Sequence, residues 1–243
     1  MFLALLLISQ DAPAEPPRFA ECMDLATGDP VAGQANAIKW RGEGGGALAR
    51  QCLGVAYANQ SRWDSAAAAF EDAAKEAELT RSAKVADYWV QSGNAWLAAG
   101  NPARARAAFD AALATATLTG LALGEANLDR SRALVAAGDI EGARGDIDKA
   151  LADAPADPLA WLLSATLARR EGDLKRAAAD IAEALKRSPD DVSVQFEAGN
   201  IAAAAGDEAN ARTAWSRVIE LSPGSQAATS ARKALEQFGA TEK

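Results

Sequence analysis

The sequence predicts an all-α protein built from repeated helix pairs, because one pattern recurs at a step of 34 residues. Gly-Asp pairs begin at Gly138, Gly172 and Gly206. In the same register follow Ala143, Ala177 and Ala211, then Ile147, Ile181 and Trp215, and finally Pro155, Pro189 and Pro223. The composition is 49% hydrophobic but only 6% aromatic, with abundant alanine, which suits closely packed helices.

Residues 158–191 show the local signals for one helix pair. Asp157 precedes Pro158, the order typical of an N-cap and a first helical residue, where a backbone N–H is not needed. Gly172 ends the first helix because glycine readily adopts a left-handed backbone conformation. Pro189 ends the second helix because it disfavours the helical conformation of the residue before it.

This step and punctuation resemble the tetratricopeptide repeat (TPR), a helix-turn-helix unit. The resemblance implies a right-handed superhelical solenoid, in which each pair buries its apolar face by stacking on its neighbours. The two upstream units are longer, and their extra residues fall in 75–85 and 115–124, where we expect longer helices or loops. The five predicted units are 47–80, 86–119, 124–157, 158–191 and 192–225.

Both ends of the chain are expected to cap the array, since a terminal repeat would otherwise expose its core. Residues 15–46 are predicted to form a linker and a degenerate helix pair, 19–26 and 31–40. In the second of these helices we expect Ala32, Ala35 and Trp40 to face inward. Residues 226–243 are predicted to form a capping helix, with an apolar face that includes Phe238, and a tail.

The N-terminus has the form of a secretory signal. An apolar run at 1–8 is followed by Ala12-Pro13-Ala14, which predicts a signal peptide at residues 1–14 and a periplasmic protein. The run has no preceding Lys or Arg, and it is too short to span a membrane. The alternative is a cytoplasmic protein whose uncleaved N-terminus packs onto the first helices.

The chain has two cysteines, Cys22 and Cys52, in helices that should be neighbours in a stacked array. If the protein is exported to an oxidising compartment, these residues are predicted to form a disulfide that ties the cap to the array. The alternative is a pair of buried reduced thiols that act as small hydrophobic side chains.

The composition argues against several classes of function. Histidine is absent, which removes the commonest general base and the commonest metal ligand. We therefore expect no enzyme activity and no catalytic, metal or cofactor site. A net charge of −8 opposes binding to nucleic acid, because phosphate backbones are also negative. The glycine-rich stretch at 41–46 lacks the lysine and the preceding strand of a phosphate-binding loop.

The resemblance also implies a binding surface, since TPR arrays line a concave groove mainly with the first helix of each unit. The register assigns to this groove Val90, Asn94, Leu128, Arg132, Leu162, Thr166, Arg169, Phe196 and Asn200. An apolar floor with a polar rim suits an amphipathic helix or an extended peptide. The carboxylate clamp of TPR co-chaperones is not matched, because Val90 and Phe196 stand where lysine would be.

We therefore expect a non-enzymatic scaffold for a protein or peptide of the cell envelope, either a monomer or a weak homo-oligomer. The alternatives are a cytoplasmic adaptor or chaperone-like protein, and an accessory subunit of an enzyme complex. A third possibility is self-association through the open ends of the array, which an apolar face left on the helix 226–238 would favour. The alternative for the groove itself is that the assigned residues pack against adjacent helices and are not free to bind.

Intact mass spectrometry of the protein from its own cells, without reductant, tests export. The expected mass lacks residues 1–14 and two hydrogen atoms, because a signal peptide is removed and a disulfide forms in an oxidising compartment. A full-length chain with both thiols reduced would contradict this prediction and favour the cytoplasmic alternative.

Overall fold

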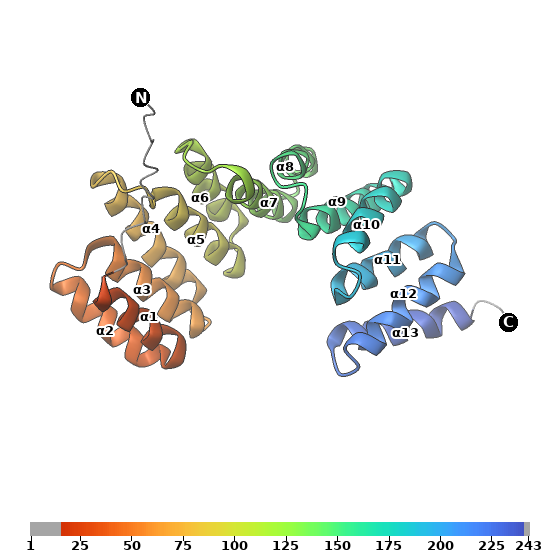
Figure 1. Cartoon of the computed structure of the whole chain (residues 1–243), viewed down its shortest axis with the longest axis horizontal. Coiled ribbons are helices and arrows are strands. Elements are labelled where there is room, and N and C mark those ends of the chain that lie inside the picture. Colours follow the sequence, from red (N-terminus) through yellow and green to blue (C-terminus); the bar gives the residue numbers. More distant parts are fainter. Residues whose placement is uncertain (1–15, 241–243) are drawn as a thin grey trace, which may run out of the picture. The chain divides into compact units, whose positions relative to one another are not determined.

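The structure, a computed structural model, describes residues 16–240, with the side chains of 238–240 excepted, and contains thirteen α-helices in that range (Figure 1). No strand occurs among these residues, which confirms the predicted all-α class. The predicted signal peptide at 1–14 and the end of the tail at 241–243 lie outside the described residues, as does the side chain of Phe238.

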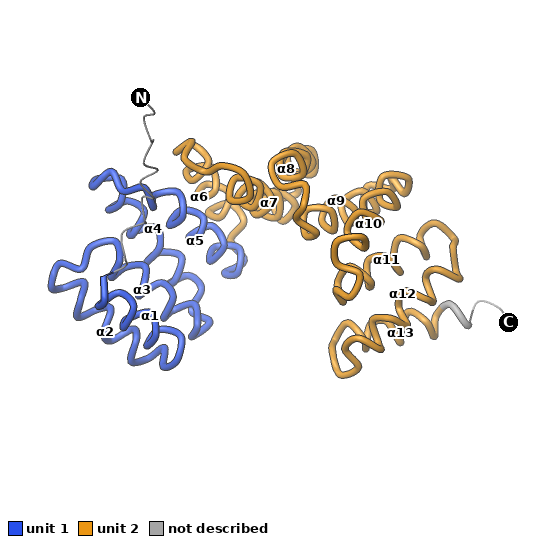
Figure 2. The backbone as a smooth tube through the Cα atoms, viewed as in Figure 1, with its two compact units in different colours: residues 1–100 blue, residues 101–243 orange. Residues whose placement is uncertain are grey.

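The chain divides into two compact units, Met1–Gly100 and Asn101–Lys243 (Figure 2). In the first unit each helix packs against the next along the chain, and α1 also packs against α3. Its helices are α1 (Pro17–Gly28), α2 (Pro30–Gly42), α3 (Gly46–Asn59), α4 (Trp63–Leu79) and α5 (Val85–Ala98).

In the second unit, helices again pack in chain order, and α9 contacts α11 while α11 contacts α13. The helices are α6 (Pro102–Ala114), α7 (Gly120–Ala137), α8 (Ile140–Asp153), α9 (Pro158–Glu171), α10 (Leu174–Arg187), α11 (Val192–Ala204), α12 (Glu208–Leu221) and α13 (Gln226–Ala240). Helices α5 and α6 belong to different units, so the assignment of 86–119 to one repeat stays a prediction.

The glycines of the Gly-Asp pairs end helices, as the sequence predicts, and the structure assigns a second role to the aspartates. Gly138, Gly172 and Gly206 have φ angles of 83°, 81° and 77°, the left-handed conformation that glycine tolerates best. The aspartate after each glycine caps the next helix: Asp173 Oδ1, for example, accepts a hydrogen bond from the backbone N–H of Arg176 at 3.0 Å. Each pair therefore ends one helix and begins the next.

Close approach of the two helices in a pair depends on small residues opposite large ones. Ala143, Ala177 and Ala211 are fully buried. At Gly199, an added Cβ would lie 2.4 Å from Trp215 Nε1, so the indole of α12 occupies the space that a side chain on α11 would need. Gly54 of α3 and Phe70 of α4 repeat this arrangement, with a closest distance of 2.5 Å.

The cap helix α2 differs from the prediction, because Ala35 is exposed and the buried residues are Gly33, Ala37 and Trp40. Gly33 explains the rotation of the helix: a Cβ there would lie 2.5 Å from the Cα of Ala26, so α2 crosses α1 at its glycine. The apolar residues on the opposite side of α2 therefore face outward.

A disulfide joins Cys22 of α1 to Cys52 of α3, with a Cα–Cα distance of 6.1 Å. Both cysteines are fully buried, within a core cluster that contains Phe19, Trp40 and Leu53. The bond closes a sequence separation of 30 residues and links the cap covalently to the helix on which it packs.

Reduction of this disulfide should lower the free energy of unfolding by about 3–4 kcal/mol, because the open chain gains entropy in the unfolded state. Urea denaturation of the oxidised and reduced protein measures the difference. The variant Cys22→Ser/Cys52→Ser should not respond to reductant. An equal loss of stability in this control would mean that the reductant acts elsewhere.

Ala177→Leu should lower the free energy of unfolding by about 1–3 kcal/mol, because the helix pair has no space for a larger side chain at this buried position. The matched control is Ala179→Leu, an exposed position on the same helix, which should change stability little. Equal urea midpoints for the two variants would contradict the predicted packing register.

Candidate binding groove

A cavity of about 170 Å³ is lined by α7 and α9, the first helices of two successive pairs, and by one residue of α8. Its floor is formed by apolar side chains and its rim by polar ones. The lining residues are Ser131, Arg132 and Val135 of α7, Ile147 of α8, and Leu163, Thr166, Leu167 and Arg170 of α9. The structure thus brings two of the predicted groove residues, Arg132 and Thr166, to one site.

The two charged residues that line this cavity are both arginines, although the whole chain has a net charge of −8. Arg132 is exposed and donates a hydrogen bond to Asp129 Oδ1 on its own helix at 3.2 Å. Arg170 is exposed and makes no ion pair or side-chain hydrogen bond with any residue that the structure describes. The rim therefore offers guanidinium groups to an anion, beside an apolar floor.

Two other predicted groove residues, Arg169 and Asn200, hold helices together. The guanidinium of Arg169 donates to both carboxylate oxygens of Glu197 on α11, at 2.6 and 3.3 Å. Asn200 Nδ2 donates to the same carboxylate at 3.0 Å, and its Oδ1 accepts from Trp215 Nε1 at 3.3 Å. Because Glu197 is only 7% exposed, this network compensates a buried charge and fixes α9 against α11.

Leu128 corrects the predicted groove. It is only 2% exposed, packs in a core cluster with Ile147 and Leu167, and is not among the residues that line the cavity. The prediction placed Leu128 on a first helix, α7, as observed. Its side chain does not face a groove, because α8 and α9 cover that part of α7.

The remaining predicted residues divide between packing and partial exposure. Leu162 and Phe196 are half-buried and pack beside the core clusters of α9–α11 and α11–α13 respectively. The Thr166 hydroxyl donates to the Leu162 carbonyl at 2.9 Å. Val90 and Asn94 are half-buried on α5, in the first unit, where Gln51 Nε2 of α3 donates to Gln91 Oε1 at 3.4 Å.

Sequence reasoning missed Val135, Leu163 and Arg170 as lining residues. The sequence did contain a signal for them, because each lies one or three positions from an assigned residue. The pair Arg169-Arg170 in particular places two cations side by side in the sequence. Neighbouring side chains on a helix point about 100° apart. An error of one residue in the groove assignment therefore selects Arg169, which is paired, in place of Arg170, which is exposed.

The tetratricopeptide repeat family model matches residues 53–117, 128–183 and 162–226 of the chain. The chain belongs to the tetratricopeptide repeat family. This membership confirms the TPR-type fold class, and arrays of this kind are scaffolds for protein interaction. No curated protein sequence matches the chain.

Solved structures with a similar fold include three proteins of interest. PilW, a widely conserved type IV pilus biogenesis factor, has a TM-score of 0.70 at 21% identity over 89% of this chain and 99% of its own. PilF of Pseudomonas aeruginosa has a TM-score of 0.69 at 15% identity over 93% and 98%. YrrB, a TPR protein with an unusual peptide-binding site, has a TM-score of 0.56 at 17% identity over 80% and 96%. These likenesses concern the fold.

Within the described residues, no helix is both long and apolar enough to cross a membrane, and no group of three or more acidic or cysteine side chains is arranged to hold a metal ion.

Arg169→Met should lower the free energy of unfolding by about 1–3 kcal/mol, because the buried Glu197 carboxylate loses its main partner. The double variant Arg169→Met/Glu197→Gln should recover part of the loss, since it removes the unpaired charge as well. Thermal unfolding of the two single variants and the double variant measures this coupling. Strictly additive losses would contradict it.

Proposed function

We propose that this protein is a non-enzymatic scaffold that binds a peptide or helix of a cell-envelope protein along the first-helix face formed by α7, α9 and α11. The single observation that carries the proposal is the cavity between α7 and α9, which joins an apolar floor to the open guanidinium of Arg170. Arg132 stands on the same rim.

The chemistry of the cavity defines the segment that fits it. A leucine or isoleucine side chain would displace water from the floor formed by Ile147, Leu163 and Leu167. An aspartate or glutamate beside it would pair with Arg170 or Arg132, and such charge-assisted hydrogen bonds are stronger than neutral ones. The partner segment is therefore acidic and carries an aliphatic anchor.

The proposal includes the predicted organisation of the chain. Residues 47–225 form the five units, residues 15–46 and 226–243 form the caps, and residues 1–14 are removed on export. Within the first unit, Val90 and Asn94 provide a second, shorter stretch of first-helix surface. Leu162 and Phe196, which are half-buried on α9 and α11, contribute further apolar contact area on the first-helix face.

Export to the periplasm is supported by the buried disulfide, because such bonds persist in oxidising compartments and are rare in the cytoplasm. A similar fold in a type IV pilus biogenesis factor agrees with a role at the cell envelope. The cytoplasmic adaptor remains the competing function, and the intact mass distinguishes it from the exported scaffold.

Selection from a random 12-residue peptide display library tests the groove. Peptides selected on the wild-type protein should contain Leu or Ile beside Asp or Glu. Their affinity should fall at least tenfold for Arg132→Glu/Arg170→Glu, because both rim charges are reversed. The matched control is Lys175→Glu/Lys186→Glu, which makes the same change in net charge at two exposed residues of α10 outside the cavity.

Equal loss of affinity in both variants would show that net charge, and not the cavity, attracts the peptides. Selected peptides without acidic residues, or binding that survives the reversal at Arg132 and Arg170, would contradict the proposed site. Urea denaturation of both variants establishes that each remains folded.

A further inference from the structure

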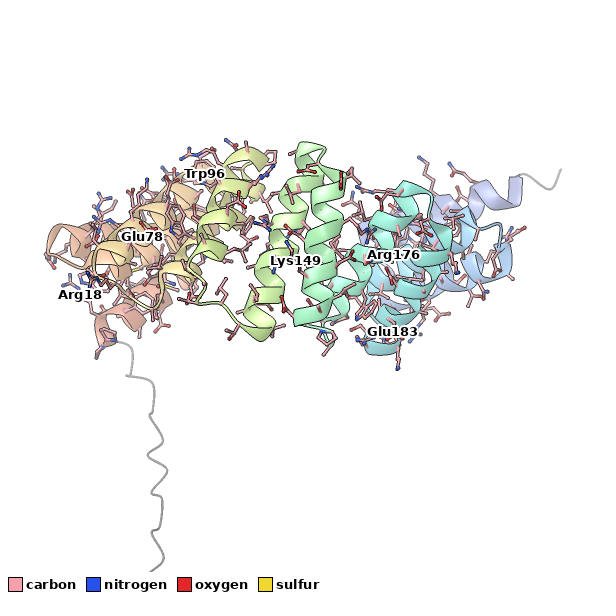
Figure 3. All side chains as sticks on the ribbon, turned by 90° about the horizontal axis from the view of Figure 1, so that it is seen from above. Arg18, Glu78, Trp96, Lys149, Arg176 and Glu183 are labelled. Carbon is pink, nitrogen blue, oxygen red and sulfur yellow. A yellow bond between two sulfur atoms is a disulfide. The ribbon has the colours of Figure 1, made fainter. Side chains whose placement is uncertain are left out.

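The second helices of the pairs create a different surface in the second unit. We define three furrows on this side by their side chains, each set drawn from two second helices and the first helix between them. Furrow I lies between α6 and α8 over α7, furrow II between α8 and α10 over α9, and furrow III between α10 and α12 over α11. Figure 3 labels Lys149 on α8, at furrow I, and Arg176 on α10, at furrow II.

Furrow I is a charged cavity of about 440 Å³. The guanidinium of Arg130 donates to both oxygens of the buried Asp146 carboxylate, at 2.6 and 2.8 Å, and to Asp110 Oδ1 at 2.7 Å. Arg106 adds longer ion pairs to Asp110 and Asp139, at 3.7 and 3.6 Å. The arginines and aspartates that line this furrow are therefore paired with one another.

Furrow II carries a second charged network at equivalent positions. Arg144 donates to Ser164 Oγ at 2.9 Å and to Glu171 Oε2 at 3.0 Å. Arg176 forms ion pairs with Asp180 at 3.3 Å and with Asp148. Ser164 in turn donates a hydrogen bond to the Asp180 carboxylate, so polar side chains of α8, α9 and α10 are joined across the furrow.

In furrow III, alanine stands at the positions equivalent to these charged and polar residues. The equivalents are Ala178 for Arg106 and Arg144, Ala182 for Asp110 and Asp148, Ala198 for Arg130 and Ser164, and Ala214 for Asp146 and Asp180. The result is a cavity of about 430 Å³ whose lining is mainly apolar, with Ile181, Leu185 and Ile201 among the alanines. Asp207 is the one charged residue that lines it. It lies exposed at the start of α12, which it caps by accepting hydrogen bonds from the backbone N–H and the side-chain amide of Asn210, at 3.1 and 2.6 Å.

The first unit carries an exposed apolar ridge on α2, which we define as Val31, Ala35 and Ile38. Their spacing places them on one face of the helix, and Val31 and Ile38 are 68% and 40% exposed. Lys39 and Arg41 are exposed at the C-terminal end of this ridge, and neither forms an ion pair with a described residue. The helix itself contains no acidic residue.

We propose that the α2 ridge of one copy docks into furrow III of a second copy. The branched side chains of Val31 and Ile38 supply the volume that the alanine-lined cavity lacks. Lys39 or Arg41 would meet Asp207 at the rim, so the two surfaces are complementary in charge as well as in shape. An α2–α2 contact is less favourable in this respect, because each helix brings two unpaired cations to it.

This contact is heterologous, since it joins different surfaces of the two copies. Each added copy leaves one ridge and one furrow open, so association continues beyond a dimer. The surfaces are small, and small interfaces give weak, transient association. The expected behaviour is therefore a mean mass that rises steadily with protein concentration.

Two variants separate the two halves of the contact. Val31→Gln/Ile38→Gln removes the apolar ridge and leaves furrow III intact. Ala178→Arg/Ala182→Asp places in furrow III the charged pair that the other two furrows carry, at exposed positions and without a change in net charge. Sedimentation equilibrium should show that each variant alone is monomeric, while the wild type grows beyond a dimer.

The decisive measurement is an equimolar mixture of the two variants. Each retains the half that the other lacks, so the mixture should form a 1:1 dimer that grows no further. Leu79→Gln/Leu121→Gln, which removes two other exposed leucines, is the matched control and should associate like the wild type. Urea denaturation of every variant checks its folding.

Three results would overturn the proposal. One is a wild type that stays monomeric at millimolar concentration. Another is a mixture of variants that does not dimerise. The third is association that stops at a dimer and is abolished by the α2 variant alone, which would indicate pairing of two α2 helices. Both variants retain Arg132 and Arg170, so peptide binding at the first-helix groove is tested independently.

Discussion

The structure depends on the close approach of two helices through small residues. An indole or phenyl ring on the second helix of a pair occupies the position that a glycine leaves empty on the first, as at Gly199 and Trp215. Buried alanines such as Ala177 permit the same closeness elsewhere. This packing holds each pair together and leaves apolar surface that a neighbouring pair must cover, which is why the helices stack in chain order.

Stacking gives the second unit two kinds of surface with different chemistry. Along the first-helix face, one arginine is used to compensate a buried glutamate while its neighbour, Arg170, stays open beside an apolar cavity. Along the second-helix side, arginines and aspartates pair with one another in two furrows, and the third furrow carries alanine at the equivalent positions. The same repeat therefore presents surfaces whose charged side chains pair with one another and surfaces that offer an unpaired arginine or an apolar lining. The difference lies in the residue types at equivalent positions of the helix pairs.

Much of the architecture follows from local signals in the chain. The Gly-Asp pairs specify helix ends because they combine a left-handed residue with an N-cap, and their effect needs no distant contact. The binding residues were harder to predict. Leu128 occupies the expected position on α7 but is covered by neighbouring helices. Arg169 pairs with Glu197 of α11, whereas Arg170, which points in another direction, stays exposed.

The sequence by itself determined the helical class, the repeat register and the identity of the buried alanines, since each depends on spacing within a few turns of helix. Only the tertiary structure decided which side chains remain available. Arg169 and Arg170 are adjacent and chemically identical, and their roles diverge because one reaches a buried carboxylate on the next first helix. Similarly, Gly33 faces α1 and Ala35 faces solvent. The close contact between the two helix backbones at Gly33 stabilises this orientation more than burial of the Ala35 methyl group would stabilise the other one.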